Sequence, residues 1–228
     1  LDLLPISQQE PPRMKLYTYD HCPFCTRARM IFGLKNQPLD NQFLLNNDEA
    51  TTIGLIGKKM LPILIKADGS AMGESLDIVH YVDGISGGTP LAAAVRPEIS
   101  AWLARIGDYQ YRLVWPRCIQ IGLPEFATQA AIDYFVAKKS AVIGDFDHNF
   151  TQTDTLLPQL NADLAALAEL TASTDGINGA IGEEDIVLFP LLRNLSMVKG
   201  VAWPSAVLDY MQRISQRSGV ALFLDRAV

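Results

Sequence analysis

Two cysteines with two residues between them are the side chains of this sequence best suited to covalent chemistry. Cys22 and Cys25 follow a short aromatic, β-prone segment (15–19) and precede a run of helix-forming residues that starts at Thr26. The pair therefore lies at a predicted helix start, where free backbone N–H groups and the helix dipole stabilise a thiolate. We expect the pKa of Cys22 to be lowered and Cys25 to be more buried and less acidic. Cys22 would attack a disulfide and Cys25 would resolve the mixed disulfide.

The same cysteine spacing also occurs in zinc sites, which usually need four ligands. The only other cysteine, Cys118, is far away in the sequence, and the three histidines (His21, His80 and His148) show no ligand spacing. A cysteine pair between a strand and a helix instead favours thiol–disulfide exchange, so we expect no metal. A structural or chemically inert pair is the remaining alternative.

Composition and charge describe an ordinary globular protein. The chain has 228 residues, 49% of them hydrophobic, and a formal net charge of −6. This is enough for one large or two modest domains with a core that needs no disulfides. The negative charge argues against nucleic-acid binding, and no uninterrupted apolar run reaches the length of a membrane-spanning helix. Three cysteines argue against a secreted, disulfide-linked scaffold.

The N-terminal segment carries no recognisable targeting signal. Residues 1–13 lack the basic start and the apolar stretch of a signal peptide. Met14 is a natural start, so we expect residues 1–13 to be an unstructured extension and exclude them from the fold. The cytoplasm is the location expected by default.

The segments around the cysteines alternate between strand-like and helix-like patterns. Pro38 ends the first predicted helix, and Asp68-Gly69 is a hairpin turn signal. Ser75 is a suitable N-cap for a helix that ends at Gly84. The first two strands should be parallel with a right-handed crossover, and the last two antiparallel. The expected order is strand 15–19, helix to about 36, strand 39–45, helix 50–56, strand 63–67, strand 71–73 and helix 75–84.

Three short motifs give this part of the chain a resemblance to a known fold family. Residues 15–84 resemble the thioredoxin fold of the glutaredoxin and glutathione-transferase branch. In that family the proline before the third strand follows a cis peptide and faces the active cysteine. The motifs are CPFC at 22–25, MLP at 60–62 before a buried strand, and GES at 73–75 at the start of the last helix.

The resemblance implies a glutathione site next to Cys22. It implies that the Leu61–Pro62 peptide is cis and that the backbone of Leu61 binds the cysteinyl part of glutathione. It also implies that Glu74 pairs with the glutathione ammonium, while Ser75 and the helix N-terminus bind its carboxylate. The less favoured alternatives are an ordinary proline at a strand start for Pro62, and an N-cap at Ser75 beside a solvated Glu74.

Several residues near the cysteines have two interpretations each. His21 either lowers the pKa of the neighbouring thiol or is a solvated loop histidine. Arg27 and Arg29 either hold the thiolate or a glutathione carboxylate, or they belong to a solvated helix face. Tyr19 and Phe24 either form walls of the site or belong to the core.

The second half of the sequence is helical in pattern. Residues 85–97, with Gly-Gly and two prolines, form a predicted linker, and nothing in residues 98–228 has catalytic spacing. Cys118 is expected to be a packed bystander. Gly182 to Asp185 resembles the capping box of the glutathione-transferase helical domain, with Gly182 in place of the hydroxyl residue, and Asp185 could still reach back. The predicted helices are 98–115, 124–143, 155–170, 183–198 and 205–218.

A thioredoxin-like domain (14–84) followed by an all-helical domain (98–228) is similar to the glutathione-transferase architecture. With its CPFC motif, the chain resembles the large two-domain, type-two glutaredoxins of bacteria, although Phe24 stands where glutaredoxins usually have tyrosine. The resemblance implies a monomeric enzyme that uses glutathione to reduce protein disulfides and glutathionylated proteins. Two alternatives stay open. A cysteine-type glutathione transferase would not need the resolving Cys25, and a non-catalytic glutathione-binding module would not need either thiol to be activated.

Overall fold

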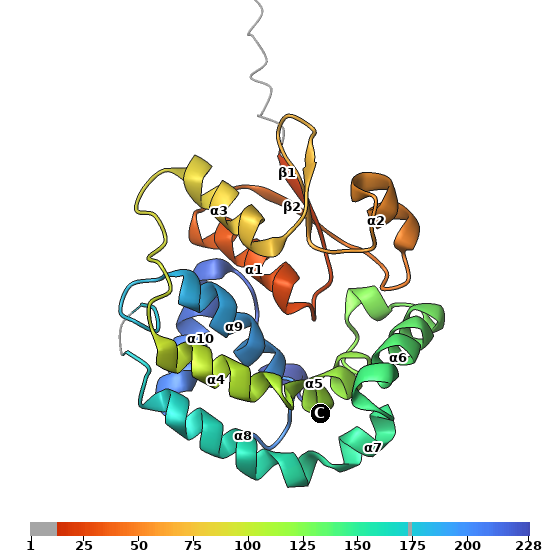
Figure 1. Cartoon of the computed structure of the whole chain (residues 1–228), viewed down its shortest axis with the longest axis vertical. Coiled ribbons are helices and arrows are strands. Elements are labelled where there is room, and N and C mark those ends of the chain that lie inside the picture. Colours follow the sequence, from red (N-terminus) through yellow and green to blue (C-terminus); the bar gives the residue numbers. More distant parts are fainter. Residues whose placement is uncertain (1–12, 173–174) are drawn as a thin grey trace, which may run out of the picture.

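The computed structural model describes residues 13–172 and 175–228. Residues 1–12, most of the predicted N-terminal extension, therefore lie outside the described part of the chain. The described residues form a small sheet with three helices and a larger assembly of helices, which Figure 1 shows one above the other. The predicted fold class, a thioredoxin-like part followed by an all-helical part, is confirmed.

The described strands form one mixed sheet with the order β2-β1-β3-β4. β1 (Met14–Thr18) pairs in parallel with β2 (Leu39–Phe43) and antiparallel with β3 (Ile63–Ile65). β3 forms an antiparallel hairpin with β4 (Ala71–Met72). The predicted parallel pair and the predicted hairpin are confirmed, and the inner strand β1 leads directly to the two cysteines.

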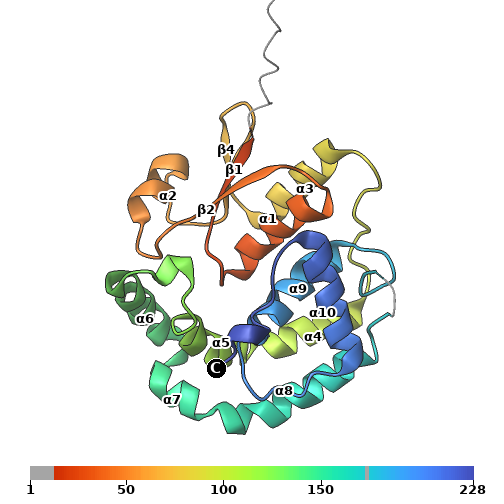
Figure 2. The ribbon, with the colours of Figure 1, turned by 180° about the vertical axis from the view of Figure 1, so that it is seen from behind.

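α1 (Pro23–Leu34) is the helix on which the two parts meet. It packs against α3 (Ser75–Ser86) in the sheet-containing part and against α9 (Glu183–Leu195) and α10 (Ser205–Ser218) in the helical part. α2 (Glu49–Ile56) lies on the other side of the sheet in both views (Figures 1 and 2). Because α1 is covered on several sides, four of its apolar residues are buried: Ala28, Met30, Ile31 and Phe32.

The helical part follows a connection of residues 87–96. Its buried apolar side chains and those around α1 form one continuous core. The predicted helix 205–218 is found with the same bounds as α10. Before α9 and α10, the described elements of this part are α4 (Pro97–Gly107), α5 (Gln110–Cys118), the short 3₁₀ helix η1 (Pro124–Phe126), α6 (Gln129–Ile143), α7 (Phe146–Thr151) and α8 (Thr153–Ala168). The 3₁₀ helix η2 (Leu224–Arg226) follows α10.

The predicted helix 98–115 is wrong, because the structure divides it into α4 and α5. The break falls at Asp108 and Tyr109. Tyr109 is buried there, and its hydroxyl donates a hydrogen bond to Asp163 at 2.7 Å. Pro116, the predicted end of that helix, instead lies inside α5. A tertiary contact therefore overrides the local helical pattern.

Other predicted helix bounds also shift. The predicted helix 124–143 begins as η1 and restarts as α6 after Thr128, whose hydroxyl accepts the N–H of Ala131. α7 was not predicted, and α8 begins before residue 155. α3 does not end at Gly84 as predicted. Gly84 is in helical conformation, and the helix ends at Ser86. Short helices and their ends depend on local caps, which a hydrophobic pattern does not reveal.

The start of α9 explains why a glycine replaces the expected hydroxyl residue. As predicted, Asp185 reaches back, and its Oδ2 accepts the N–H of Gly182 at 2.8 Å. Its Oδ1 accepts the N–H of Ile177 and the hydroxyl of Tyr210, both at 2.8 Å. A Cβ at Gly182 would lie 2.7 Å from the carbonyl oxygen of Ala92, so the connection passes too closely for any side chain.

Gly33 allows α1 and α10 to pack closely, which generates a stability prediction. A Cβ at Gly33 would lie 1.9 Å from the backbone oxygen of Ser218 at the end of α10. We expect Gly33→Ala to force the two helices apart and to lower the free energy of unfolding by about 1–3 kcal/mol, measured by urea denaturation.

Gly54→Ala in α2 is the matched control, since a Cβ there would meet no atom within 4 Å. The free energy of unfolding of this variant should rise by about 0.5–1 kcal/mol, because alanine has a higher helix propensity than glycine. Equal effects of the two substitutions would contradict the close α1–α10 contact.

Candidate redox site

The two cysteines occupy the start of α1. Cys22 is the N-cap residue, and its sulfur accepts a hydrogen bond from the backbone N–H of Cys25 at 3.4 Å. Pro23 begins the helix and has no N–H to leave unsatisfied. Cys22 is partly exposed, whereas Cys25 is buried, and the sulfur of Cys25 accepts the N–H of Tyr19 at 3.4 Å. The two thiols are therefore free, close together and unequal in exposure.

The surroundings shift the pKa values of the two thiols in opposite directions. The hydrogen bond with Cys25 lowers the pKa of Cys22 to about 7, against the opposing effect of burial. The charge of His21 and the N–H groups at the helix start act in the same direction. Burial, followed by the interaction with Cys22, raises the pKa of Cys25 well above its usual range. Cys22 is thus the more acidic thiol, as the sequence predicts.

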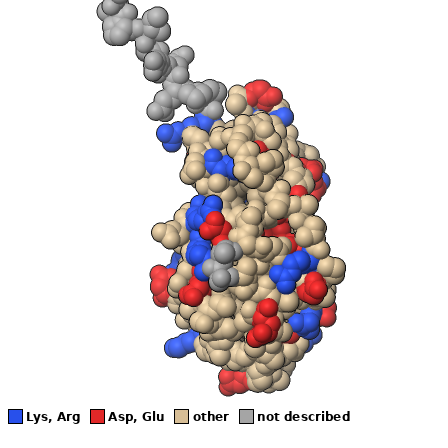
Figure 3. All heavy atoms as spheres, turned by 90° about the vertical axis from the view of Figure 1, so that its left-hand side faces the viewer, with Lys and Arg blue, Asp and Glu red and all other residues tan. Residues whose placement is uncertain are grey.

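A cavity of about 330 Å³ opens at Cys22 and is lined by residues of both parts of the chain. Its described lining contains lysines and no carboxylate, whereas acidic and basic side chains are interspersed on the face seen in Figure 3. Such a lining suits a ligand that is anionic and partly apolar. The sheet-containing part contributes Tyr19, Phe24, Lys59 and Leu61, and α5 and α6 contribute Tyr111, Trp115, Tyr134, Phe135, Lys138 and Lys139.

The expected glutathione-binding residues lie at two places. The Leu61–Pro62 peptide is cis, as the resemblance implies, and Leu61 lines the cavity. Glu74 is exposed, has a φ of 62°, and lies 3.3 Å from the Nζ of Lys58. The prediction that Ser75 is the N-cap of α3 is wrong, because Glu74 holds that position and Ser75 is buried in the first turn. Neither of these two residues is among the described cavity-lining residues.

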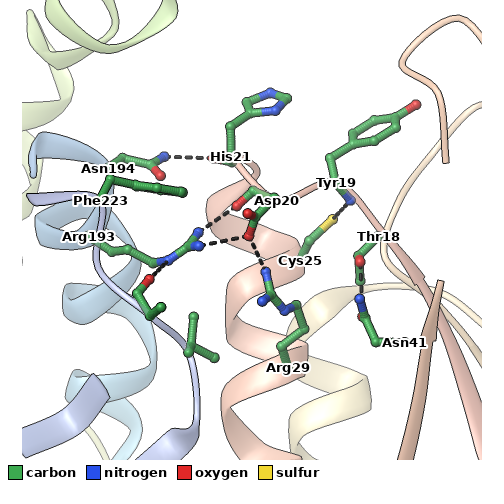
Figure 4. A network of polar contacts seen from close by, with 12 residues as sticks. Thr18, Tyr19, Asp20, His21, Cys25, Arg29, Asn41, Arg193, Asn194 and Phe223 are labelled. Carbon is green, nitrogen blue, oxygen red and sulfur yellow. Dashed lines mark hydrogen bonds and ion pairs between the residues drawn. The ribbon is translucent and has the colours of Figure 1, made fainter. Parts of the chain in front are cut away.

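The loop before Cys22 is held by α9, as Figure 4 shows. Arg193 donates hydrogen bonds to the backbone oxygen of Asp20 at 2.5 Å and to its carboxylate at 2.7 Å. Arg29 binds the same carboxylate oxygen at 2.5 Å, and Asn194 donates to the backbone oxygen of His21 at 2.7 Å. Burial opposes ionisation of Asp20, but the charges of Arg193 and Arg29 hold its pKa below the usual range. The position of the loop before Cys22 thus depends on the helical part.

The structure also decides between the interpretations of the flanking residues. His21 is buried beside Glu125, so the hypothesis of a solvated loop histidine is wrong. Arg29 binds Asp20, and the guanidinium of Arg27 lies 4.7 Å from the centre of the Phe24 ring. Tyr19 and Phe24 both line the cavity, and Cys118 is buried as expected of a packed bystander.

Sequence analysis missed three residues that contact the loop before Cys22: Glu125, Arg193 and Asn194. Arg193 and Asn194 carried one usable signal, since they are polar residues inside a helix that is otherwise apolar on nearly all sides. Glu125 carried none, because it follows a proline at a predicted helix start, where an acidic residue is common.

Within residues 13–172 and 175–228, no group of three or more His, Cys, Asp or Glu side chains is arranged to hold a metal ion. The expected absence of a metal stays a prediction. In the same residues, no helix is both long and apolar enough to cross a bilayer.

Comparisons with known proteins match most of the chain. Residues 98–227 match the model of the glutaredoxin 2 C-terminal domain, and residues 16–90 match that of the glutathione S-transferase N-terminal domain. Glutaredoxin 2 of Escherichia coli (strain K12) is 44% identical over 94% of this chain and 100% of its own length. The chain belongs to the glutaredoxin 2 family. It is a glutathione-dependent oxidoreductase, as the sequence predicts.

Solved structures agree with the glutaredoxin 2 assignment. The crystal structure of glutaredoxin 2 from Salmonella typhimurium in complex with glutathione has a TM-score of 0.92 and 44% identity, and covers 94% of this chain and 99% of that one. A glutathione transferase from Phanerochaete chrysosporium shares only the fold, with a TM-score of 0.70 at 15% identity over 91% of this chain and 98% of that one. Its likeness supports the predicted glutathione-transferase architecture.

The pKa asymmetry of this glutaredoxin predicts a selective alkylation. We expect the rate at which iodoacetamide modifies Cys22 to rise with pH around a midpoint near 7, because only the thiolate reacts. Peptide mass spectrometry should find Cys25 and Cys118 unmodified in the folded chain, since both are buried.

Cys118→Ser should leave this profile unchanged, and Cys22→Ser should abolish it. A midpoint near the value of a free cysteine, about 8.5, would contradict the activation of Cys22 by its surroundings.

Proposed function

We propose that the chain reduces protein disulfides and glutathione mixed disulfides through Cys22 and Cys25. The Cys22 thiolate attacks one sulfur of the substrate disulfide and releases the other as a thiolate. Cys25 then loses its proton and attacks the Cys22 sulfur, which releases the second substrate thiol and leaves a Cys22–Cys25 disulfide. The observation that carries this proposal is the pair of adjacent thiols with oppositely shifted pKa values, of which Cys22 lines the cavity and Cys25 is buried behind it.

Glutathione supplies the two electrons that restore the dithiol in this proposal. A first glutathione thiolate attacks the Cys22 sulfur, forming a Cys22–glutathione disulfide and freeing Cys25. A second glutathione attacks that mixed disulfide, which yields oxidised glutathione and the Cys22 thiolate. On a glutathionylated protein Cys22 alone suffices, because its attack on the glutathione sulfur releases the protein thiol. The low pKa of Cys22 favours both displacements in which it leaves.

The proposed glutathione site consists of Leu61, Pro62, Glu74 and Ser75. The backbone of Leu61, before the cis bond to Pro62, would bind the cysteinyl part, and the position of Leu61 on the cavity supports this. The carboxylate of Glu74 would pair with the γ-glutamyl ammonium. Ser75 and the N-terminus of α3 would bind the γ-glutamyl carboxylate. The exposure of Glu74 at the start of α3 supports its role.

The proposed partners are glutathione and disulfide-bonded or glutathionylated proteins, with no nucleic acid, membrane or metal. We propose a monomer, because residues of one chain line the cavity from both of its parts. We also propose a cytoplasmic location, since the reaction consumes reduced glutathione, which that compartment maintains.

A glutathione-coupled assay on a mixed disulfide tests the two-thiol mechanism. Cys22→Ser should reduce turnover to background. Cys25→Ser should retain deglutathionylation but lose reduction of protein disulfides, because the resolving step needs a second thiol. Cys118→Ser, the control, should keep both activities. Conjugation of electrophiles without disulfide turnover would favour a transferase instead. The absence of both reactions would favour a binding module.

Glu74→Gln tests the glutathione site while keeping the size of the side chain. We expect the KM for glutathione to rise roughly tenfold, equivalent to the loss of one exposed charge-assisted contact. Asp77→Asn is the matched control, since Asp77 is another exposed carboxylate in the first turn of α3. A KM that changes equally in both variants would point to the general charge of the helix start and away from a contact with Glu74.

A further inference from the structure

Glu125 is a fully buried carboxylate that contacts the residue before Cys22. It belongs to η1 in the helical part, and its Oε1 accepts the backbone N–H of His21 at 2.8 Å. The same oxygen lies 2.6 Å from the Nδ1 of the His21 ring. One carboxylate oxygen therefore fixes both the backbone and the ring of a residue 104 positions away in the sequence.

Aromatic rings surround the His21 ring on several sides. Tyr19 is stacked at 6.0 Å between centroids, and Phe126 and Phe135 each lie at 5.1 Å. Glu125 Oε2 is buried with no hydrogen-bond partner among the described residues. An ionised carboxylate in such an apolar setting costs several kcal/mol unless an opposite charge compensates it. The imidazole at 2.6 Å is the group placed to provide that charge.

We propose that Glu125 is a positioning residue of the redox site, which fixes the His21 ring and keeps it protonated, so that a positive charge lies beside Cys22. This inference rests on the proposed role of Cys22 as the attacking thiol. A protonated imidazole next to the sulfur favours the thiolate, whereas a neutral ring would contribute no charge. Part of the stabilisation of the Cys22 thiolate would then depend on a carboxylate of the helical part.

The charges around these groups set the expected direction of an experiment. Tyr19, directly after β1, and Glu125 of η1 face His21. Cys22 interacts with Cys25 and Arg27 of α1 and with Tyr111 of α5, and lysines of α6 and the loop before Pro62 line the same cavity. Arg27 and the lysines remain in every variant below. Where the Cys22 thiolate is less stabilised in these variants, it therefore still forms.

Glu125→Gln removes the charge but keeps an oxygen that can accept the His21 N–H. If Glu125 keeps the imidazole protonated, the variant loses the nearby cation, and the alkylation midpoint of Cys22 should rise by about one pH unit. If the ring is neutral in the wild type, the variant merely removes a negative charge, and the midpoint should fall. An unchanged or lowered midpoint overturns the proposal.

Asp163→Asn is the matched control. Asp163 is another buried carboxylate of the helical part. It is bound by Arg105 of α4 and by Tyr109, which lies between α4 and α5. This variant should lose stability without moving the alkylation midpoint. A midpoint that moves equally in both variants overturns the proposal, because it would reflect general loosening of the helical part.

A measurement on the wild-type chain covers the case in which Glu125→Gln does not fold. Nitrogen-15 NMR of the His21 ring, assigned by comparison with His21→Asn, should show both ring nitrogens protonated at about pH 7. A neutral ring at that pH overturns the proposal. Neither alkylation nor NMR needs turnover, so a negative result in these two experiments leaves the oxidoreductase mechanism unaffected. Conversely, a chain without oxidoreductase activity that shows the predicted shift of the alkylation midpoint would contradict only that mechanism.

Discussion

A buried carboxylate between two guanidinium groups is the interaction on which the site depends. Asp20 is 8% exposed, and Arg29 of α1 and Arg193 of α9 both bind its Oδ1. Arg193 is in turn held by the backbone oxygen of Ala221 at 2.7 Å and lies 3.9 Å from the centre of the Phe223 ring. Removing one partner from such a group commonly costs about 3–5 kcal/mol, because a charge is left buried and unpaired. The segment after α10 therefore helps to fix the loop before Cys22.

The same helix start produces two thiols with opposite properties. Cys22 is the N-cap of α1 and accepts the N–H of Cys25 at the partly exposed end, while Cys25 lies in the first turn and is enclosed in the core. This difference in depth separates a thiol that ionises near neutral pH from one whose pKa is raised well above its usual range. The cavity then exposes only the first of them to a ligand.

Much of the fold and the centre of the site could be predicted because their signals are local. The cysteine pair, the parallel β1–β2 unit and the bounds of α10 follow from spacing and hydrophobic periodicity, and the cis bond before Pro62 follows from the resemblance. The rest depends on contacts between distant residues. Arg193 and Asp20 are 173 positions apart, and the break at Tyr109 depends on Asp163. The prediction of Ser75 as the N-cap of α3 was wrong by one residue. Glu74, with its positive φ, is the last residue before the helix.

The attachment of the loop before Cys22 to α9 and η1 has a consequence for how this protein can evolve. In many multidomain enzymes the parts can be shuffled, because few specific contacts cross between them. Here the sheet-containing part supplies Arg29 to Asp20, but the other partners that hold the loop come from the helical part: Arg193, Asn194 and Glu125. Recombination that exchanged the helical half for that of a distant relative would have to transfer all three residues together. We therefore expect the two halves to be inherited as a single unit, even though each has its own recognisable architecture.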